Sequence, residues 1–305
     1  MTKIIPRELI KHLEWVPGQQ TPQKSLVVPT PVIQPVQQRT GSIDELIKNG
    51  KEFYSEQKDS KGNYIGVAVA LQEAYNAMGS DGIIASMPYL IAGKSQADKK
   101  NYLWKNWFTA NTEEDVGIDV NGLYVSKGKP VLITLHGGGI LTPERIKQAY
   151  KEGLTEQNAA KLLQEDIDLI LQSGTLPSGE KIPVYSFDIL KSGISDPFGR
   201  CAVITDFEKV KSLESKQFKK KEFMENPLVL ARAGTLEYLE KYFDKAKDSD
   251  GVGCWHRFNQ IDINQPQGRV LFVSYDYGGL LGYDNLNYDG RFVGVAPEAP
   301  VARKK

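Results

Sequence analysis

The chain has 305 residues, with 38 basic and 38 acidic side chains and two cysteines, so it is long enough to bury a large core without disulfide bonds. The neutral balance argues against a nucleic-acid-binding protein, whose affinity comes mostly from lysines and arginines that neutralise phosphates. No apolar run reaches the roughly 18 residues that cross a bilayer. Together these features predict a soluble, cytoplasmic protein with neither nucleic-acid nor membrane partners.

The segment 17–40 is rich in proline and glutamine and almost free of charge. It has no helical period, so we expect an extended arm or linker. The apolar stretches 26–28 and 31–33 favour an arm that lies along a surface over a solvated linker. We therefore divide the chain into an arm over residues 1–41 and one globular domain over 42–305, and we consider a sub-boundary near 215–226.

Helical patterns occur three times before residue 111. Ser42 and Glu45 form a capping-box pattern, which marks the start of a helix, and Gly79 is typical of a helix end. The stretch 83–92 is apolar but contains Pro88, so it fits a strand or a kinked helix. The predicted helices cover residues 42–56, 67–78 and 99–110.

The clearest local pattern is a strand, a glycine loop and a helix. Residues 131–135 have the composition of a strand, and the tetrapeptide His-Gly-Gly-Gly follows at 136–139. Thr142 suits the N-cap and Pro143 the first position of a helix that runs to about residue 151. Glycines let the backbone approach a ligand closely, and a helix N-terminus offers unpaired N–H groups. The loop 136–145 therefore predicts a site for a phosphate or carboxylate anion.

The residues of this loop supply most of the candidate site. His136 is the candidate acid, base or hydrogen-bond donor, because an imidazole can change its charge near neutral pH. Either of two arginines could pair with the anion. The candidate ligand-binding residues are Gly137, Gly138, Gly139, Arg145 and Arg200. A glycine turn that simply joins a strand to a helix is the alternative.

The tetrapeptide 136–139 also resembles the oxyanion-hole motif of lipase and esterase-type α/β-hydrolases, where it follows a strand. The resemblance covers four residues, and it implies a nucleophilic serine in a G-x-S-x-G pattern further along the chain. No such pattern follows Gly139, and the segment 193–197 lacks the last glycine. The serine-hydrolase interpretation is therefore not adopted.

The remaining chain alternates between strand and helix patterns. The predicted strands cover 183–188, 201–206, 269–275 and 291–295, and the predicted helices cover 155–171, a stretch from 207, and 226–247. This order indicates an α/β or α+β fold in which helices cover a mixed β-sheet. The basic run 216–223 has glutamates beside it, which favours a solvated helix face.

A cysteine nucleophile acts as a thiolate, which a neighbouring histidine or helix N-terminus favours, and the chain offers both cysteines and histidines. Cys201 lies in an apolar strand pattern, so we expect it to be buried and structural. Cys254 and His256 lie in a glycine-flanked segment that we expect at the surface, and both are candidate catalytic residues. A structural role is the alternative. The spacing of cysteines and histidines predicts no metal site, and no cofactor is assigned.

Tyrosine beside aspartate recurs in the segment 274–290. Such residues line polar ligand sites and also form ordinary hairpin turns. Two functions are therefore open. We favour a ligand-binding protein or enzyme whose partner is an anionic small molecule, because ordering three glycines is costly for a plain connection. The alternative is a non-catalytic assembly protein that forms a homo-oligomer through its N-terminal arm.

Overall fold

The computed structural model describes residues 43–192, 194, 196–248, 250–275, 278–282 and 286–297. The predicted arm over residues 1–41 lies outside these described residues. The limits of the globular domain and the sub-boundary near 215–226 remain predictions.

Helices and strands alternate along the described chain. The helices are α2 (Ile43–Asn49), α3 (Gly66–Met78), α4 (Met87–Gln96), α5 (Tyr102–Lys105), α6 (Pro143–Glu152), α7 (Gln164–Ser173), α8 (Phe187–Ser192), α9 (Phe207–Lys211), α10 (Lys220–Glu225), α11 (Pro227–Ala233) and α12 (Leu239–Ala246). The strands are β1 (Lys51–Ser55), β2 (Ile83–Ile84), β3 (Phe108–Asp119), β4 (Lys129–His136), β5 (Ala160–Lys161), β6 (Val184–Ser186), β7 (Cys201–Asp206), β8 (Lys216–Phe218), β9 (Val252–His256), β10 (Gln267–Val273), β11 (Leu280–Gly282) and β12 (Gly290–Val295).

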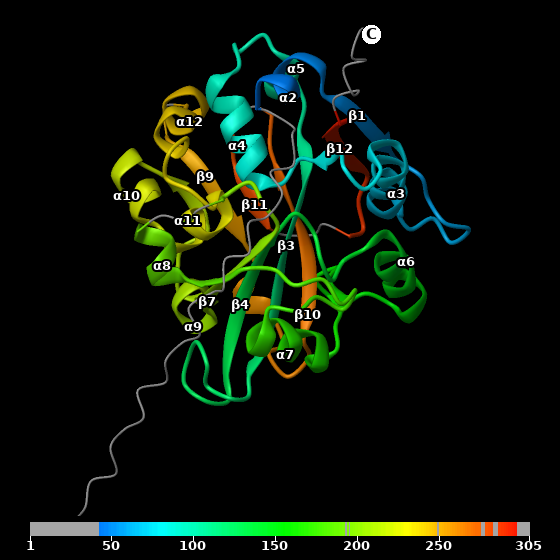
Figure 1. Cartoon of the computed structure of the whole chain (residues 1–305), viewed down its shortest axis with the longest axis vertical. Coiled ribbons are helices and arrows are strands. Elements are labelled where there is room, and N and C mark those ends of the chain that lie inside the picture. The colour runs from blue at the N-terminus through cyan, green and yellow to red at the C-terminus, as the bar shows by residue number, and fades with distance from the viewer. Residues whose placement is uncertain are drawn as a thin grey trace, which may run out of the picture. The chain divides into compact units, whose positions relative to one another are not determined.

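Two sheets form the framework of the fold (Figure 1). The larger has nine strands in the order β6-β7-β4-β3-β10-β11-β9-β8, with β5 beside β10, and the smaller has the order β1-β12-β2. Strands β6 and β7 are parallel, as are β9 and β11, while the other pairs are antiparallel. The structure therefore confirms the predicted mixed sheet covered by helices.

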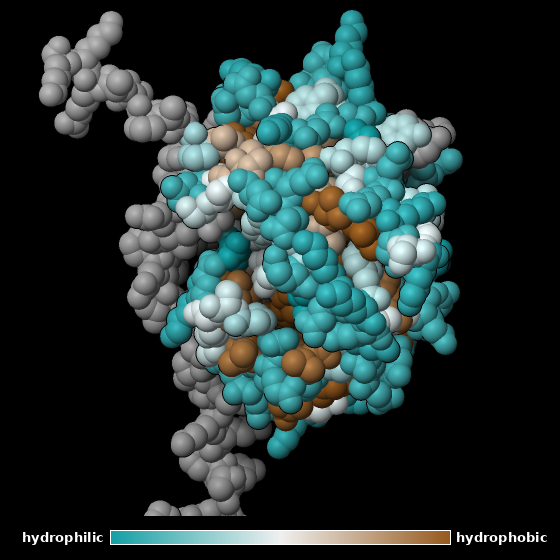
Figure 2. Space-filling model, turned by 90° about the vertical axis from the view of Figure 1, so that its right-hand side faces the viewer, coloured by the Kyte–Doolittle hydropathy of each residue, from teal (hydrophilic) through white to brown (hydrophobic). Residues whose placement is uncertain are grey.

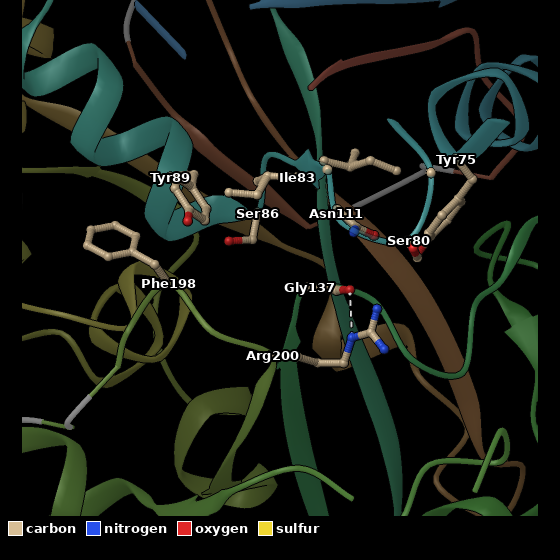
Figure 3. A pocket seen from close by; sticks show the side chains of 12 residues that line it. Tyr75, Ser80, Ile83, Ser86, Tyr89, Asn111, Gly137, Phe198 and Arg200 are labelled. Carbon is tan, nitrogen blue, oxygen red and sulfur yellow. Dashed lines mark hydrogen bonds between the residues drawn. The ribbon is translucent and has the colours of Figure 1, made fainter. Parts of the chain in front are cut away.

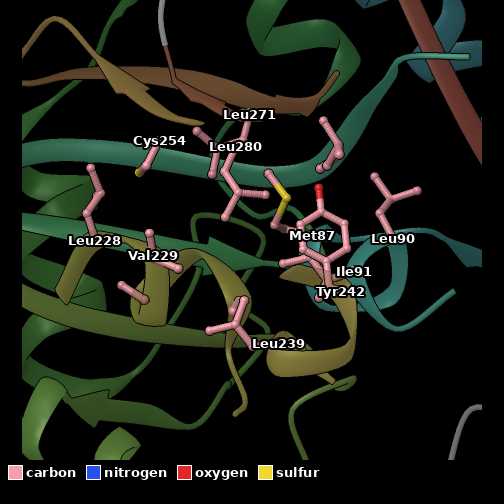
Figure 4. Close-up of a cluster of buried hydrophobic side chains, with 14 of the residues drawn as sticks. Met87, Leu90, Ile91, Leu228, Val229, Leu239, Tyr242, Cys254, Leu271 and Leu280 are labelled. Atoms are coloured by element: carbon pink, nitrogen blue, oxygen red, sulfur yellow. The ribbon is translucent and has the colours of Figure 1, made fainter. Parts of the chain in front are cut away.

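Both faces of the large sheet are buried. On β4, Leu132 packs into one hydrophobic cluster, while Val131 and Ile133 pack into the other. Alternate side chains of a strand point to opposite faces, so a strand buried on both sides is apolar throughout. Helices α4, α11 and α12 cover one face (Figures 1 and 4), α6 and α7 lie on the other, and α3 packs against β1 and β12 of the smaller sheet.

The two sheets are joined at one point beside α4. The N–H of Ala85 donates to the carbonyl of Val293 at 2.8 Å, and the carbonyl of Ala85 accepts from the N–H of Asn111 at 2.9 Å. Nearby, the N–H of Arg291 donates to the Thr109 hydroxyl at 3.2 Å. These bonds hold β12 against β3.

Several predicted helices differ from the observed ones. The helix predicted over 42–56 ends at Asn49, and Gly50 leads into strand β1. A side chain at Gly50 would lie 2.0 Å from the Tyr102 hydroxyl, which explains the glycine at this junction. The helix predicted over 99–110 is only α5, because β3 begins at Phe108 and pairs with β10.

Other differences concern where helices begin and break. The helix predicted over 155–171 begins at Gln164, after the short strand β5, and the region 226–247 is two helices. Gly234 separates them with a φ of 67°, a left-handed conformation that favours glycine. The ambiguous stretch 83–92 contains both forms, strand β2 and the start of α4, with Pro88 in the first turn of the helix. The helix 67–78 and the strand 201–206 are confirmed.

The surface is mostly hydrophilic on the face shown in Figure 2, and its hydrophobic residues form small patches. Isolated exposed apolar residues are normal on protein surfaces. The basic run 216–223 divides between β8 and α10 rather than forming one helix face. Within it, the Lys220 ammonium pairs with Glu240 at 2.8 Å and with Asp244 at 2.9 Å. None of the helices in the described ranges is both long and apolar enough to cross a membrane.

Candidate functional site

The strand, glycine loop and helix predicted from the sequence are present. Strand β4 ends at His136, and Gly137 and Gly138 have φ angles of 84° and 74°. Both values lie in the left-handed region, which glycine adopts without a steric penalty. The Thr142 hydroxyl then accepts a hydrogen bond from the N–H of Arg145 at 3.2 Å and so caps helix α6.

The N–H groups of this loop already bind a carboxylate, and it belongs to the chain itself. The N–H of Ile140 donates to one oxygen of Glu113 at 2.7 Å, and the N–H of Leu141 donates to the other at 2.6 Å. Glu113 lies on β3 with 1% of its surface exposed. Burial raises the pKa of Glu113 to about 7, although these two hydrogen bonds and Arg200 act in the opposite direction. The anion-binding geometry expected from the glycines is therefore used internally.

His136 lies beneath the loop and is completely buried. Its Nε2 lies 3.0 Å from the carbonyl oxygen of Ala231, and its Nδ1 lies 3.3 Å from the Thr112 hydroxyl. Burial lowers the pKa of His136 to about 4, so the ring is neutral near neutral pH. The imidazole thus ties β4 to α11 and has no accessible surface for a ligand.

The two candidate arginines lie in different places. The Arg145 guanidinium pairs with Glu152 at 3.2 Å and donates to the carbonyl of Lys161, so it points along α6 toward β5. The Arg200 Nε donates to the carbonyl of Gly137 at 3.1 Å, and a terminal nitrogen pairs with Glu180. Of the candidate residues, the structure brings Arg200 and Gly137 together and leaves Arg145 apart.

The pair Cys254 and His256 is on strand β9, not in a surface loop as we expected. Cys254 is 1% exposed and His256 is 8% exposed. Burial raises the pKa of Cys254 to about 11 and that of Cys201 to about 12, which keeps both thiols protonated. The His256 ring stacks on Phe258 with a centroid distance of 4.5 Å, and burial lowers its pKa to about 4. These are the properties of core residues, as predicted for Cys201.

Within the described ranges, no three histidine, cysteine, aspartate or glutamate side chains gather as metal ligands.

A different cavity, of about 480 Å³, lies where the two sheets meet, and we call it the aromatic cavity. It is lined by Trp107, Thr109, Gln217, Trp255, Phe272, Ser274, Tyr275, Gly279, Leu281, Tyr288 and Asp289. Tyr275 is 48% exposed and Tyr288 is 54% exposed. Part of the tyrosine- and aspartate-rich segment 274–290 therefore lines a cavity, and its role as a polar ligand site stays a prediction.

The floor of the aromatic cavity is held in place by close packing. A side chain at Gly253 would lie 2.1 Å from the Trp255 indole nitrogen, so the ring lies directly over this glycine. Trp107 meets Phe272 edge to face, with centroids 6.4 Å apart and an interplanar angle of 71°. The Arg291 guanidinium lies 5.6 Å from the Trp107 ring. These contacts restrict the orientations of the aromatic rings.

The rim of the cavity is linked to the smaller sheet. The Tyr54 hydroxyl on β1 donates to Asp289 at 3.2 Å. Tyr288 stacks on Tyr64, with centroids 6.5 Å apart and an interplanar angle of 16°. The rim is thus built from segments that are far apart in the sequence.

A buried ion pair lies behind the floor. The Arg232 guanidinium donates to both oxygens of Glu114, at 2.7 Å and 2.9 Å, and both side chains are fully buried. Its third nitrogen donates to the carbonyls of Trp255 at 3.0 Å and Leu280 at 2.9 Å. Arg232 therefore connects α11 with β3 and with the two strands that carry Trp255 and Leu281. Neither member of this pair stands out in the sequence, because their proximity depends on the tertiary fold.

Among the comparisons with known proteins, only the comparison of structures finds a similar protein. No protein-family model matches the chain, and no curated protein matches it. It is similar to a solved structure described as "Accommodation of massive sequence variation in Nanoarchaeota by the C-type lectin fold". The two are 25% identical, the match covers 82% of this chain and 99% of that chain, and the TM-score is 0.58. The resemblance thus extends over nearly all of that protein.

Proposed function

We propose that this chain is a non-catalytic binding protein that recognises a protein or peptide ligand at the aromatic cavity. The observation that carries the proposal is a cavity of about 480 Å³ with five aromatic side chains in its lining. Ligand sites are typically concave, mainly apolar and supplied with a few polar groups. Here the polar groups include Thr109, Gln217 and Asp289.

The composition of the segment 274–290, part of which lines the cavity, supports a macromolecular ligand. Tyrosine, serine, glycine and asparagine dominate antibody binding loops, because tyrosine gives a large contact area for little conformational entropy and the small polar residues adapt their hydrogen bonds. The segment 274–290 consists largely of these residues and aspartate. Its two described tyrosines at the cavity are about half exposed, at 48% and 54%. Tryptophan and tyrosine are enriched among binding hot spots, which lie in well-packed pockets.

The similar solved structure is described as accommodating massive sequence variation. A framework that tolerates changes at its surface suits recognition, since different side chains can be presented without rebuilding the core. Fold similarity does not determine function, so this argument supports the cavity and does not replace it.

The test is selection of a random displayed peptide library against the immobilised protein. Selected peptides should bind the wild type and change its tryptophan fluorescence, because Trp107 and Trp255 line the cavity. Trp255→Ala and Tyr288→Ala should each weaken binding at least tenfold, as for hot-spot residues. Leu169→Ala is the matched control, because Leu169 is 44% exposed on α7 and does not line the cavity.

Two outcomes would contradict the proposal. One is that no peptide is enriched above a blank surface. The other is that enriched peptides bind the Trp255→Ala and Tyr288→Ala variants as well as they bind the control. If the protein binds glycans on an array and no peptide, the first of these outcomes holds and the ligand is a carbohydrate.

Assembly through the arm at residues 1–41 stays a prediction, because the arm lies outside the described residues. Light scattering of a chain lacking residues 1–40 can check it.

A further inference from the structure

A second cavity, of about 290 Å³, opens beside the glycine loop, and we call it the glycine-loop cavity (Figure 3). Its polar wall contains Ser86, Asn111 and Arg200, and its apolar wall contains Tyr89 and Phe198. These residues come from the start of α4, from β3 and from the segment that leads into β7. The cavity is separate from the aromatic cavity, and no residue lines both.

The Ser86 hydroxyl is the first sign of a ligand. Ser86 is the N-cap residue of α4, yet its side chain makes no capping hydrogen bond. The residue is 2% exposed, and the hydroxyl has no hydrogen-bond partner in the described part of the chain. A buried hydroxyl without a partner costs stability, and native proteins seldom retain one. Ser86 lines the cavity at the N-terminal end of a ten-residue helix, where the helix dipole favours a negative group.

Arg200 supplies the positive charge. Its side chain is 17% exposed and is fixed by the Gly137 carbonyl and by Glu180, which is itself 43% exposed. A side chain at Gly137 would lie 3.3 Å from the Arg200 Cα, so the glycine permits this close approach. The second terminal nitrogen of Arg200 makes no hydrogen bond within the described residues. That nitrogen is free to donate to a ligand.

We propose that the glycine-loop cavity binds a small organic monocarboxylate. Ser86, Asn111 and Arg200 donate to the carboxylate, and the apolar body of the ligand packs against Tyr89 and Phe198. Their rings lie 4.9 Å apart between centroids and form one apolar surface. Because Glu180 and the buried Glu113 both partly neutralise Arg200, a singly charged carboxylate fits the local charge better than a phosphate dianion. This site lies beyond the proposed function, because it does not involve the aromatic cavity.

The test is isothermal titration calorimetry of the full chain with benzoate and phenylacetate, with benzamide and inorganic phosphate as contrasts. The carboxylates should bind, and benzamide and phosphate should bind at least tenfold more weakly. Ser86→Ala should weaken carboxylate binding about tenfold, the effect of one hydrogen bond to a charged group. It removes no capping bond, so its fold should be retained. Arg200→Met should abolish binding.

Glu180→Gln separates ligand binding by Arg200 from a purely structural role. It removes the carboxylate that pairs directly with Arg200, so benzoate affinity should increase several-fold if Arg200 contacts the ligand. A structural role predicts no increase. Trp255→Ala should leave benzoate binding unchanged, which distinguishes this site from the aromatic cavity. The proposal is overturned if neither carboxylate binds the wild type or Glu180→Gln at millimolar concentration, or if Ser86→Ala and Arg200→Met bind as the wild type does.

Discussion

Breaking the buried pair of Arg232 and Glu114 should be the most damaging single change near the aromatic cavity. Arg232→Met removes two hydrogen bonds to Glu114 and one each to the carbonyls of Trp255 and Leu280. It leaves a fully buried carboxylate without a cation. Loss of one partner from a buried ion pair typically costs about 3–5 kcal/mol. That is a large fraction of the roughly 5–15 kcal/mol that stabilises a native domain.

A double-mutant cycle isolates the pair. We expect Arg232→Met and Glu114→Met each to be strongly destabilising, and the double variant to be more stable than the sum predicts by about 2 kcal/mol or more. Urea unfolding followed by circular dichroism measures the four free energies, and equal slopes with urea concentration would show that the unfolding reaction is unchanged. Additive effects, or a loss below about 1 kcal/mol in Arg232→Met, would refute the argument that this pair is buried and interdependent.

Three further predictions concern residues around the same sheet. Burial raises the pKa of Glu113 from 4.5 to about 7, so the folded state favours its protonated form. The free energy of unfolding of the wild type, relative to that of Glu113→Gln, should therefore fall as pH rises from 4.5 to 7. The fall should be at most about 1.4 kcal/mol per pH unit. A difference between the two proteins that does not depend on pH would contradict this. Gly282→Ala would place its Cβ 2.2 Å from an Arg232 nitrogen, and thermal unfolding should show a loss of about 1–3 kcal/mol. Cys201 and Cys254 are each 1% exposed, so a thiol reagent should label them only after unfolding, and rapid labelling of the native protein would show that burial is wrong.

Local signals in the sequence explain which elements could be predicted. The helix 67–78 ends at Gly79, and helix α6 begins with a threonine cap and Pro143, so both depend on neighbouring residues. The helix predicted over 99–110 is wrong because the aromatic spacing of this segment also fits a strand. Pairing with the distant strand β10 makes the chain a strand from Phe108 onward. Such pairing is not encoded in a local window, and tertiary contacts override helix propensity there.

The candidate site was predicted less well, for the same reason. The glycine loop and its anion-binding geometry follow from the sequence, but the anion is Glu113, which precedes Ile140 by 27 residues. One signal was available: Glu113, Glu114 and Asp115 are consecutive acids in the middle of a strand and are followed by Val116. Buried carboxylates require partners, so this run could have been matched to the unpaired N–H groups of the loop. The partner Arg232 could not have been chosen from several arginines without the fold.

The aromatic cavity combines a rigid floor with an exposed rim, and this division bears on how a binding surface can change. Trp255 lies over Gly253, and the carbonyl of Trp255 accepts a hydrogen bond from Arg232, so its position depends on the buried core. Tyr288 is 54% exposed, and surface substitutions usually change stability by less than about 0.5 kcal/mol. Under the proposed function, substitutions at the rim would therefore alter recognition at little cost to folding, while the floor keeps the rim in place.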